Sequence, residues 1–230
     1  MARKRINATK MEIIRVASKM FLEKGYSKTT AKSICDVLEI STGNLTFYYP
    51  TKEHMLAVLV RMLCDYQWKM MEKEKTEGNG SVMAVCMELT EMIIMCHEDE
   101  IVREFFLAAY TSPMTLEIIR ENDAGRAKEV FGEFNPEWTD QQFVEAEILV
   151  SGIEYASLMP MEEPISLELC IAGAVDAVLK VFNVPEELRQ KKIRRMQELD
   201  CRKIGKRALK ELKKYIEDIE NYIVIEEFRS

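Results

Sequence analysis

Residues 25–56 constrain the fold more than any other segment, because their pattern predicts three short helices separated by two tight turns. Thr29 or Thr30 can cap the first helix, Ser41 the second and Thr51 the third. The first helix carries one apolar stripe at helical spacing, formed by Ala31, Ile34, Cys35 and Leu38. Helical periodicity continues through the rest of the chain with almost no strand signal, so the predicted fold class is all-α.

The middle of these three helices, residues 41–49, is very short and has a polar and aromatic outward face. Leu45 is its clearest inward anchor. A small polar helix braced on two longer ones is the arrangement by which a helix-turn-helix presents side chains to the DNA major groove. The segment therefore predicts a three-helix helix-turn-helix domain.

Residues 9–56 resemble the DNA-binding domain of the tetracycline-repressor (TetR) family of bacterial regulators. The positions that agree are Gly25, Tyr26, Thr29, Thr30, Ile34, Ile40, Ser41, Gly43, Leu45, Tyr48, Thr51, Lys52 and Glu53. Three positions depart from the family pattern. Glu39 replaces a frequent turn glycine, Thr46 replaces a frequent tyrosine and Cys35 replaces a frequent alanine. We expect an altered turn at Glu39, a lost DNA contact at Thr46 and a neutral core change at Cys35.

The first turn of the predicted recognition helix contains the residues expected nearest to the base edges. Asn44 can pair with N6 and N7 of adenine, and Thr42 can bond several bases. Gly43 has no side chain and lets the backbone approach DNA closely. Phe47 is predicted to contact a thymine methyl group, with a place in the core as the alternative.

Phosphate contacts are implied by the resemblance for Tyr48, Lys52 and Thr29. Lys52 also lies in the first turn of the following helix, where free backbone N–H groups favour an anion. The complete expected DNA-binding set is Thr29, Thr42, Gly43, Asn44, Thr46, Phe47, Tyr48 and Lys52.

The charge distribution agrees with a DNA-binding head on a separate body. Residues 1–56 carry ten Lys/Arg and five Asp/Glu, whereas residues 57–230 carry 22 Lys/Arg and 34 Asp/Glu. A basic segment on an acidic chain suits local contact with phosphate. We therefore predict a DNA-binding domain over residues 1–56 and a helical effector-binding and dimerisation domain over residues 57–230.

Several classes of protein are disfavoured. No apolar run is long enough to span a bilayer, no secretory signal is recognisable, and six dispersed cysteines suit a reducing cytoplasm, which is the expected location. Cys86, Cys96 and His97 lack metal-ligand spacing, so no metal site is expected, and no cofactor either. With two histidines and no nucleophile elbow or phosphate loop, the chain is not predicted to be an enzyme.

The predicted body contains candidates for a ligand pocket. A helix from Lys52 to about Lys75 leaves the head and can transmit movement, and the next, from Ser81 to about Cys96, is rich in methionine and cysteine. Methionine adapts to varied ligands, although filling of the core is the alternative role. The candidate pocket residues are Met87, Met95, Phe105, Phe106, Tyr110 and Tyr155.

Two helices with small and apolar faces are predicted over residues 139–158 and 166–182, with Thr139 and Ser166 as their caps. They resemble the dimer interface of the family, a four-helix bundle built from two copies, with an intramolecular core as the alternative. The charged tail, residues 186–230, carries a short heptad stripe of Leu209, Leu212, Ile216, Ile219 and Ile223. It is expected to pack on the body or on a partner subunit, and a second nucleic-acid site is the alternative.

The resemblance implies a homodimeric, ligand-responsive repressor that is released from a palindromic operator by a small-molecule effector. The alternative is a DNA-bound adaptor that is regulated by a protein partner. Two copies of the 41–49 helix would read successive major grooves about one turn apart.

Overall fold

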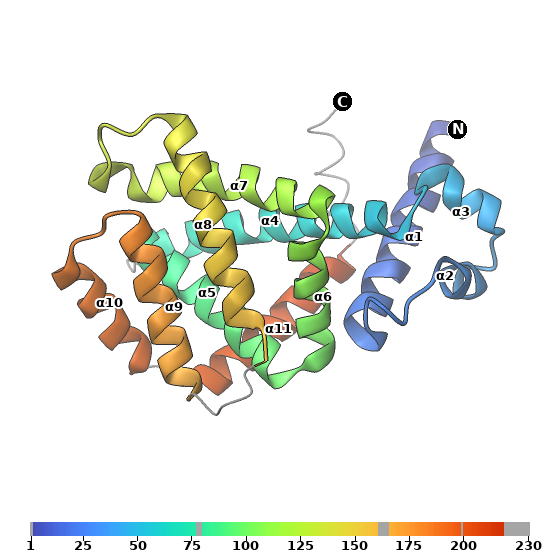
Figure 1. Ribbon diagram of the computed structural model, residues 1–230. Coiled ribbons are helices and arrows are strands. Elements are labelled where there is room, and N and C mark those ends of the chain that lie inside the picture. Colours follow the sequence, from blue (N-terminus) through green and yellow to red (C-terminus); the bar gives the residue numbers. More distant parts are fainter. Residues whose placement is uncertain (1, 77–79, 161–165, 199, 219–230) are drawn as a thin grey trace.

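A computed structural model describes residues 2–76, 80–160, 166–198 and 200–218. Within these ranges the chain forms eleven α-helices and one short 3-10 helix, and no strand (Figure 1). The predicted all-α fold class is therefore confirmed. The helices divide into a head at one end of the molecule, built from the first three, and a larger helical body.

The head consists of α1 (Ala2–Lys24), α2 (Ala31–Leu38) and α3 (Thr42–Tyr48). Gly25 ends α1 with a positive φ of 97°, a conformation that glycine adopts without a steric penalty. Thr30 caps α2 through a capping box with Ser33. Glu39 ends α2 in the left-handed region, with φ 52°, so the turn keeps the glycine-like conformation although the side chain is not glycine.

Thr9 and Glu12 have the spacing of a capping box and Gly25 can end a helix, so the sequence predicts a first helix from Thr9 to Gly25. The observed beginning of α1 differs. The helix begins at Ala2, so Thr9 lies inside it. Glu12, the expected partner in a capping box, instead binds Arg15 one turn later, with 2.5 Å between carboxylate and guanidinium. Glu12 can also form an i,i+3 ion pair inside a helix. The spacing of Thr9 and Glu12 therefore fits both the start and the interior of a helix.

The long helix α4 (Lys52–Thr76) leads from the head into the body (Figure 1). The body continues with α5 (Ser81–Glu98), α6 (Glu100–Thr111), α7 (Pro113–Phe131), the 3-10 helix Gly132–Phe134, α8 (Asp140–Leu158) and α9 (Leu167–Val181). The predicted caps at Thr139 and Ser166 are present, as is the proline at the first position of α7. α4 packs against α5 and α7, and α8 packs against α7 and α9.

The sequence Asp123-Ala124-Gly125 predicts a bend or break of the helix at this point, but α7 is continuous through these residues. The expectation is wrong because tertiary contacts hold this turn. The guanidinium of Arg126 binds Asp123 on α7 and Glu88 on α5. These buried ion pairs outweigh the weak helix propensity of one glycine, which costs about 1 kcal/mol.

The charged tail forms α10 (Glu186–Gln197) and α11 (Cys201–Glu217). α11 packs on α5, α1 and α4, with Leu212 and Ile216 buried, which confirms the prediction of packing on the body. Ile219 and Ile223, the last two positions of the predicted stripe, lie outside the described residues. Gly205 allows the close crossing, because a Cβ atom there would lie 2.4 Å from the side chain of Ile94 on α5.

One hydrophobic core runs from the head into the body, so the two parts are packed against each other. It includes Phe21 of α1 and Leu45 of α3 in the head, and Phe105, Phe131 and Phe182 in the body. None of the helices in the described ranges combines the length and the apolar character that a bilayer-spanning segment requires.

Candidate DNA-binding surface and ligand cavity

α3 is held on the head by its N-terminal cap and by one apolar side chain. The Ser41 hydroxyl accepts a hydrogen bond from the backbone N–H of Asn44 at 3.2 Å. Leu45 is 1% exposed, and Tyr49, directly after the helix, is also buried. These anchors fix which face of the short helix points to solvent.

The solvent face of α3 carries most of the predicted DNA-binding residues. Thr42, Gly43, Asn44, Thr46 and Phe47 are all exposed. Phe47 is 76% exposed, so its alternative place in the core is excluded. The Thr46 hydroxyl donates to the carbonyl oxygen of Thr42 at 3.0 Å, so its hydrogen is used within the helix.

Tyr48 and Lys52 lie at the edge of this face and are half-buried. The ring of Tyr48 packs edge-on against that of Phe47, with 5.1 Å between centroids. The Lys52 ammonium donates to the carbonyl oxygen of Tyr26 at 2.9 Å and lies 4.0 Å from the centroid of the Tyr26 ring. Lys52 therefore holds the start of α4 against the turn between α1 and α2, and a bound phosphate would have to share its ammonium.

The expected phosphate contact by Thr29 does not fit the structure. Its side chain is 0% exposed, and its hydroxyl donates to the carbonyl oxygen of Gly25 at 2.8 Å. Thr29 therefore closes the turn from inside, and the neighbouring exposed Thr30 is the cap of α2. The family match fixed the position of the residue in the chain but not the direction of its side chain.

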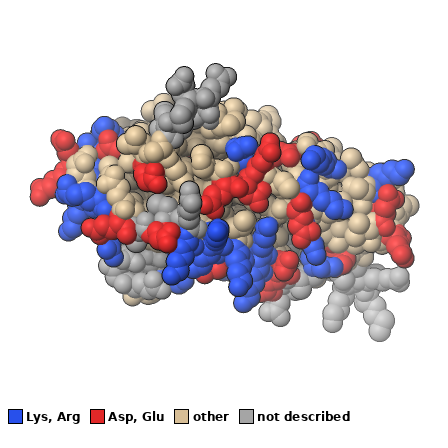
Figure 2. All heavy atoms as spheres, turned by 90° about the horizontal axis from the view of Figure 1, so that it is seen from below, with Lys and Arg blue, Asp and Glu red and all other residues tan. Residues whose placement is uncertain are grey.

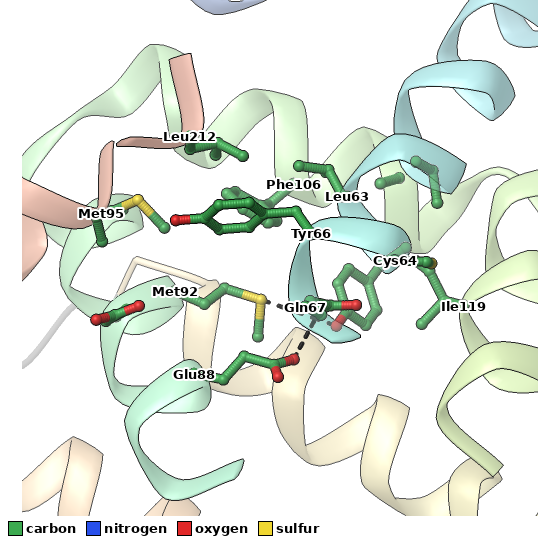
Figure 3. A pocket seen from close by; sticks show the side chains of 15 residues that line it. Leu63, Cys64, Tyr66, Gln67, Glu88, Met92, Met95, Phe106, Ile119 and Leu212 are labelled. Carbon is green, nitrogen blue, oxygen red and sulfur yellow. Dashed lines mark hydrogen bonds between the residues drawn. The ribbon is translucent and has the colours of Figure 1, made fainter. Parts of the chain in front are cut away.

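A cavity of about 690 Å³, including its open mouth, lies in the body between α4, α5, α6, α7 and α11 (Figure 3). Three of the six predicted pocket residues line it, namely Met95, Phe106 and Tyr110. The other lining residues are Val60, Leu63, Cys64, Tyr66, Gln67, Glu88, Glu91, Met92, Ala109, Ile119, Ala208 and Leu212.

The other three candidates, Met87, Phe105 and Tyr155, do not line this cavity. Helix geometry explains the first two. Glu88, Met92 and Met95 follow one another at steps of four and three along one face of α5, and Met87 is off that face. Phe105 lies between Glu104 and Phe106 on α6, so its side chain does not share the direction of Phe106. It is fully buried in the core instead. α8, which carries Tyr155, contributes no residue to this cavity.

Sequence reasoning missed two walls of the cavity. α4 lines it with a stripe at helical spacing that includes Val60, Leu63, Cys64 and Gln67. The apolar part of this stripe was visible in the sequence, but nothing there indicated a cavity rather than a packed interface. α11 supplies Leu212 and Ala208, and only the tertiary packing of the tail could reveal them.

The cavity is mostly apolar, with a few polar atoms from its walls (Figure 3). Gln67 donates to a carboxylate oxygen of Glu88 at 2.7 Å. The Tyr110 hydroxyl donates to Glu154 at 2.8 Å. Within the described ranges the buried hydroxyl of Tyr66 has no hydrogen-bond partner. A ligand with one polar group could satisfy it, because buried polar groups normally find a partner.

A second cavity, of about 440 Å³, is lined by both charged and apolar side chains. Its charged residues are Glu88, Asp123, Arg126, Glu147 and Glu154. Burial raises the pKa of Glu147 to about 10 and that of Glu154 to about 8, and repulsion by Asp123 adds to both shifts. Burial also raises the pKa of Asp123 to about 6, against the opposing effect of Arg126. At neutral pH, Glu147 and Glu154 therefore hold protons.

Metal binding is not indicated for these carboxylates. Across the described parts of the chain, no three His, Cys, Asp or Glu side chains are grouped so that they could hold a metal ion.

An apolar patch lies on the exposed side of α8 and α9, which run side by side (Figure 1). On α8, Val144, Ile148 and Leu149 are exposed, the last to 62%. On α9, Leu169 is exposed to 65%. Large exposed apolar side chains on two neighbouring helices are candidates for an interface with another protein.

The head and the body meet where α6 reaches the turn between α1 and α2. A carboxylate oxygen of Glu104 on α6 accepts a hydrogen bond from the backbone N–H of Ser27. A Cβ atom on Gly25 would lie 2.5 Å from the other carboxylate oxygen of Glu104, and the positive φ of 97° at this position independently favours glycine. α6 also contributes to the cavity wall, and it therefore connects the cavity to the head.

Basic side chains gather on the underside of the body, where α10 and α11 lie (Figure 2). On α11 the exposed basic residues are Lys203, Lys206, Arg207, Lys210 and Lys214. The side of α11 that faces the body is apolar, so this distribution is that of an amphipathic helix with a solvated face.

Comparison with known proteins agrees with the geometry of the head. Residues 13–59 match the model of a family described as bacterial regulatory proteins, tetR family. Over 89 residues the chain is 32% identical to the uncharacterized HTH-type transcriptional regulator YuxN of Bacillus subtilis (strain 168), and the match covers 38% of this chain and 31% of that relative.

Over 61 residues the chain is 33% identical to the HTH-type transcriptional repressor KstR2 of Mycobacterium tuberculosis (strain ATCC 25618 / H37Rv), a match that covers 26% of this chain and 30% of the relative. The chain thus spans about a third of the length of these curated relatives. Among solved structures, Salmonella enterica GusR is 20% identical, with a TM-score of 0.49 over 76% of this chain and 95% of that chain.

Both relatives are named as HTH-type transcriptional regulators or repressors, and the matched family is described as bacterial regulatory proteins. The match begins within α1 and ends within α4, so it spans α2 and α3 together with the start of the helix that leads into the body. This match and the helix-turn-helix geometry of α1–α3 identify residues 13–59 as a domain of the tetR family of bacterial regulatory proteins.

Proposed function

We propose that this chain is a homodimeric transcription repressor that binds a palindromic operator and is released by a small-molecule effector. The observation that carries the proposal is the solvent face of α3. It combines an exposed amide, that of Asn44, with an exposed aromatic ring, that of Phe47, on a helix anchored by Leu45. These are the side-chain types that read adenine and the methyl group of thymine in the major groove.

Dimerisation is proposed to occur through the apolar side of α8 and α9. Two copies of this pair of helices would form a four-helix bundle and cover Ile148, Leu149 and Leu169. A two-fold interface of this kind places two copies of α3 on one side of DNA. This arrangement suits an operator with half-sites about one helical turn apart.

Release is proposed to follow a shift in the positions of α4 and α6. Both helices line the larger cavity, and both reach the head, α4 as its last helix and α6 through Glu104. A ligand that binds one arrangement of these helices more tightly than the other changes the affinity for DNA. Couplings of this kind are typically about 1–3 kcal/mol.

An adaptor that is regulated by a protein partner would need no cavity in its body. The cavity among α4, α5, α6, α7 and α11 therefore supports a small-molecule effector. A regulator of this kind acts in the compartment that holds the DNA, which in a bacterium is the cytoplasm.

The stoichiometry of the complex with DNA tests the proposal. A duplex selected from random DNA by the full chain should carry two chains, as measured by native mass spectrometry or light scattering. Binding of one chain, or of a number that grows with the length of the duplex, would contradict the homodimeric reader.

A further inference from the structure

The two cavities of the body have a strong excess of acidic side chains. Among the described residues, the carboxylates that line them are Glu88, Glu91, Asp123, Glu147 and Glu154, and Arg126 is the one cationic side chain in either lining. Arg126 is already bound to Glu88 and Asp123. An anionic ligand would meet repulsion from these walls, and a cationic ligand would be attracted.

Glu147 is the side chain that most needs a partner. It is 3% exposed and lines the smaller cavity, and within the described ranges its carboxyl group makes no hydrogen bond or ion pair. Because α8 presents it inward from between Phe143 and Val150, it cannot turn to solvent without unpacking the helix. A buried carboxyl group without a partner is costly, so a ligand that offered a hydrogen bond and a positive charge would bind there favourably.

The two cavities are neighbours that share side chains. Glu88 lines both of them. Tyr110 lines the larger cavity and donates a hydrogen bond to Glu154, which lines the smaller one. A ligand could therefore place an apolar body in the larger cavity, between α4, α5 and α11, and a polar head beside Glu154 and Glu147.

We propose that the body binds one amphipathic organic cation, with its ammonium or amidinium head at Glu147 and Glu154 and its apolar part in the larger cavity. This inference rests on the proposed function and names the chemical class of the effector. An organic cation is favoured over a metal ion because the acidic side chains in the described ranges are not arranged to hold a metal. It is favoured over a purely polar polyamine because the larger cavity is walled by Leu63, Met92, Met95, Phe106 and Leu212.

Protonation provides a signature of this binding mode. Glu147 and Glu154, with pKa values raised to about 10 and about 8, hold protons at pH 7 in the free protein, and a bound cation favours their ionised forms. Binding should therefore release protons, and the affinity should rise between pH 6 and pH 8. The titratable and charged groups that face the head are Cys64 on α4, Glu88 on α5, Tyr110 on α6, Asp123 and Arg126 on α7, and Glu147 and Glu154 on α8.

The test uses three probes that share one apolar chain and differ in charge. Octylammonium, 1-octanol and octanoate are titrated into the full chain by calorimetry at pH 7. Octylammonium should bind about tenfold or more tightly than 1-octanol, and octanoate more weakly than either. Repeating the octylammonium titration in two buffers of different ionisation enthalpy measures the protons released.

Matched variants locate the head group. Glu147→Gln and Glu154→Gln keep the shape of the side chain but cannot ionise when a cation binds, so each should weaken the binding of octylammonium by about tenfold and leave the binding of 1-octanol unchanged. Glu121→Gln, at an exposed position on α7, is the control and should change the affinity for neither octylammonium nor 1-octanol. Circular dichroism of each variant verifies folding, and the comparison of the three probes on the unmodified chain needs no variant.

Three outcomes would overturn the proposal: equal affinity for the three probes, octylammonium binding that survives both substitutions, or saturable binding of sodium or potassium ions that octylammonium merely displaces. The proposed function is tested separately by binding to DNA. If the chain binds a two-fold symmetric duplex but not octylammonium, the proposed cation site is wrong and the proposed repressor function is supported. If octylammonium binds at Glu147 and Glu154 but leaves the DNA complex intact, the cation site is supported, but its role as the effector site is wrong.

Discussion

The carboxylate of Glu104, in the middle of α6, accepts a hydrogen bond from the backbone N–H of Ser27, in the turn that joins α1 to α2. This contact joins the body to the DNA-binding head at a point 77 residues away in the chain. On one side of it α6 continues to Phe106 and Tyr110 in the cavity wall, and on the other side the turn leads into α2 and α3. The contact is therefore a direct mechanical link between the proposed ligand site and the proposed DNA reader.

Glu104→Ala should loosen this link. Ser27 loses its acceptor, and a hydrogen bond to a charged group typically contributes about 1.5–3 kcal/mol. The amide of Ser27 should exchange with solvent about tenfold faster, as measured by hydrogen exchange, with a smaller loss in the free energy of unfolding. Glu100→Ala, at an exposed position of the same helix, is the control. Unchanged exchange at Ser27 would show that the contact is dispensable.

Asn44→Ala should change the choice of DNA sequence. Its amide is exposed in the first turn of α3, and the loss of one bidentate contact to a base costs about 1–3 kcal/mol at that base pair. Lys52→Met is the comparison, because a lost phosphate contact weakens all sequences alike and lowers the salt dependence. Fluorescence anisotropy on the preferred duplex and on single-base variants distinguishes the loss of a base contact from the loss of a phosphate contact. If Asn44→Ala kept the original base preference, its role in base reading would be wrong.

Leu149→Lys should convert a dimer into monomers. Leu149 is 62% exposed on α8, and burying an unpaired lysine against a second copy is strongly unfavourable. Sedimentation velocity should show twice the mass of the chain for the unmodified protein and the single mass for the variant. Val37→Lys introduces the same charge at another exposed apolar position, on α2, and should leave the dimer intact. A dimer that persists in Leu149→Lys would exclude this face as the interface.

Glu39→Gly should stabilise the protein. Glu39 has φ 52°, and the left-handed conformation costs a residue with a Cβ atom about 1 kcal/mol relative to glycine. Its side chain is exposed to solvent. Glu39→Ala keeps the Cβ atom and is the matched control. Urea unfolding should give a higher midpoint for glycine than for alanine, and equal midpoints would mean that the turn relaxes without cost.

Local patterns predicted the elements that depend on neighbours in the chain. The caps at Thr30, Ser41, Thr139 and Ser166 and the end of α1 at Gly25 are all present, because each depends on a few consecutive residues. The exposed face of α3 follows in the same way from the inward anchor at Leu45.

Features that depend on tertiary packing were not predictable. Thr29 matches its family position, but its side chain turns inward to Gly25. Gly125 was expected to interrupt α7, but contacts between Arg126 and Glu88 on another helix hold that region together. The wall of the cavity that includes Leu212 depends on where α11 docks, which periodicity alone cannot determine.

The central claim is that two copies of this chain read one symmetric DNA site through α3. Selection of bound sequences from random DNA by the full chain, at a stated salt concentration, tests it most directly. We predict enrichment of a two-fold symmetric site with half-sites about one helical turn apart, and loss of that preference in Asn44→Ala. Enrichment of a single asymmetric site, or of no site at all, would contradict the account.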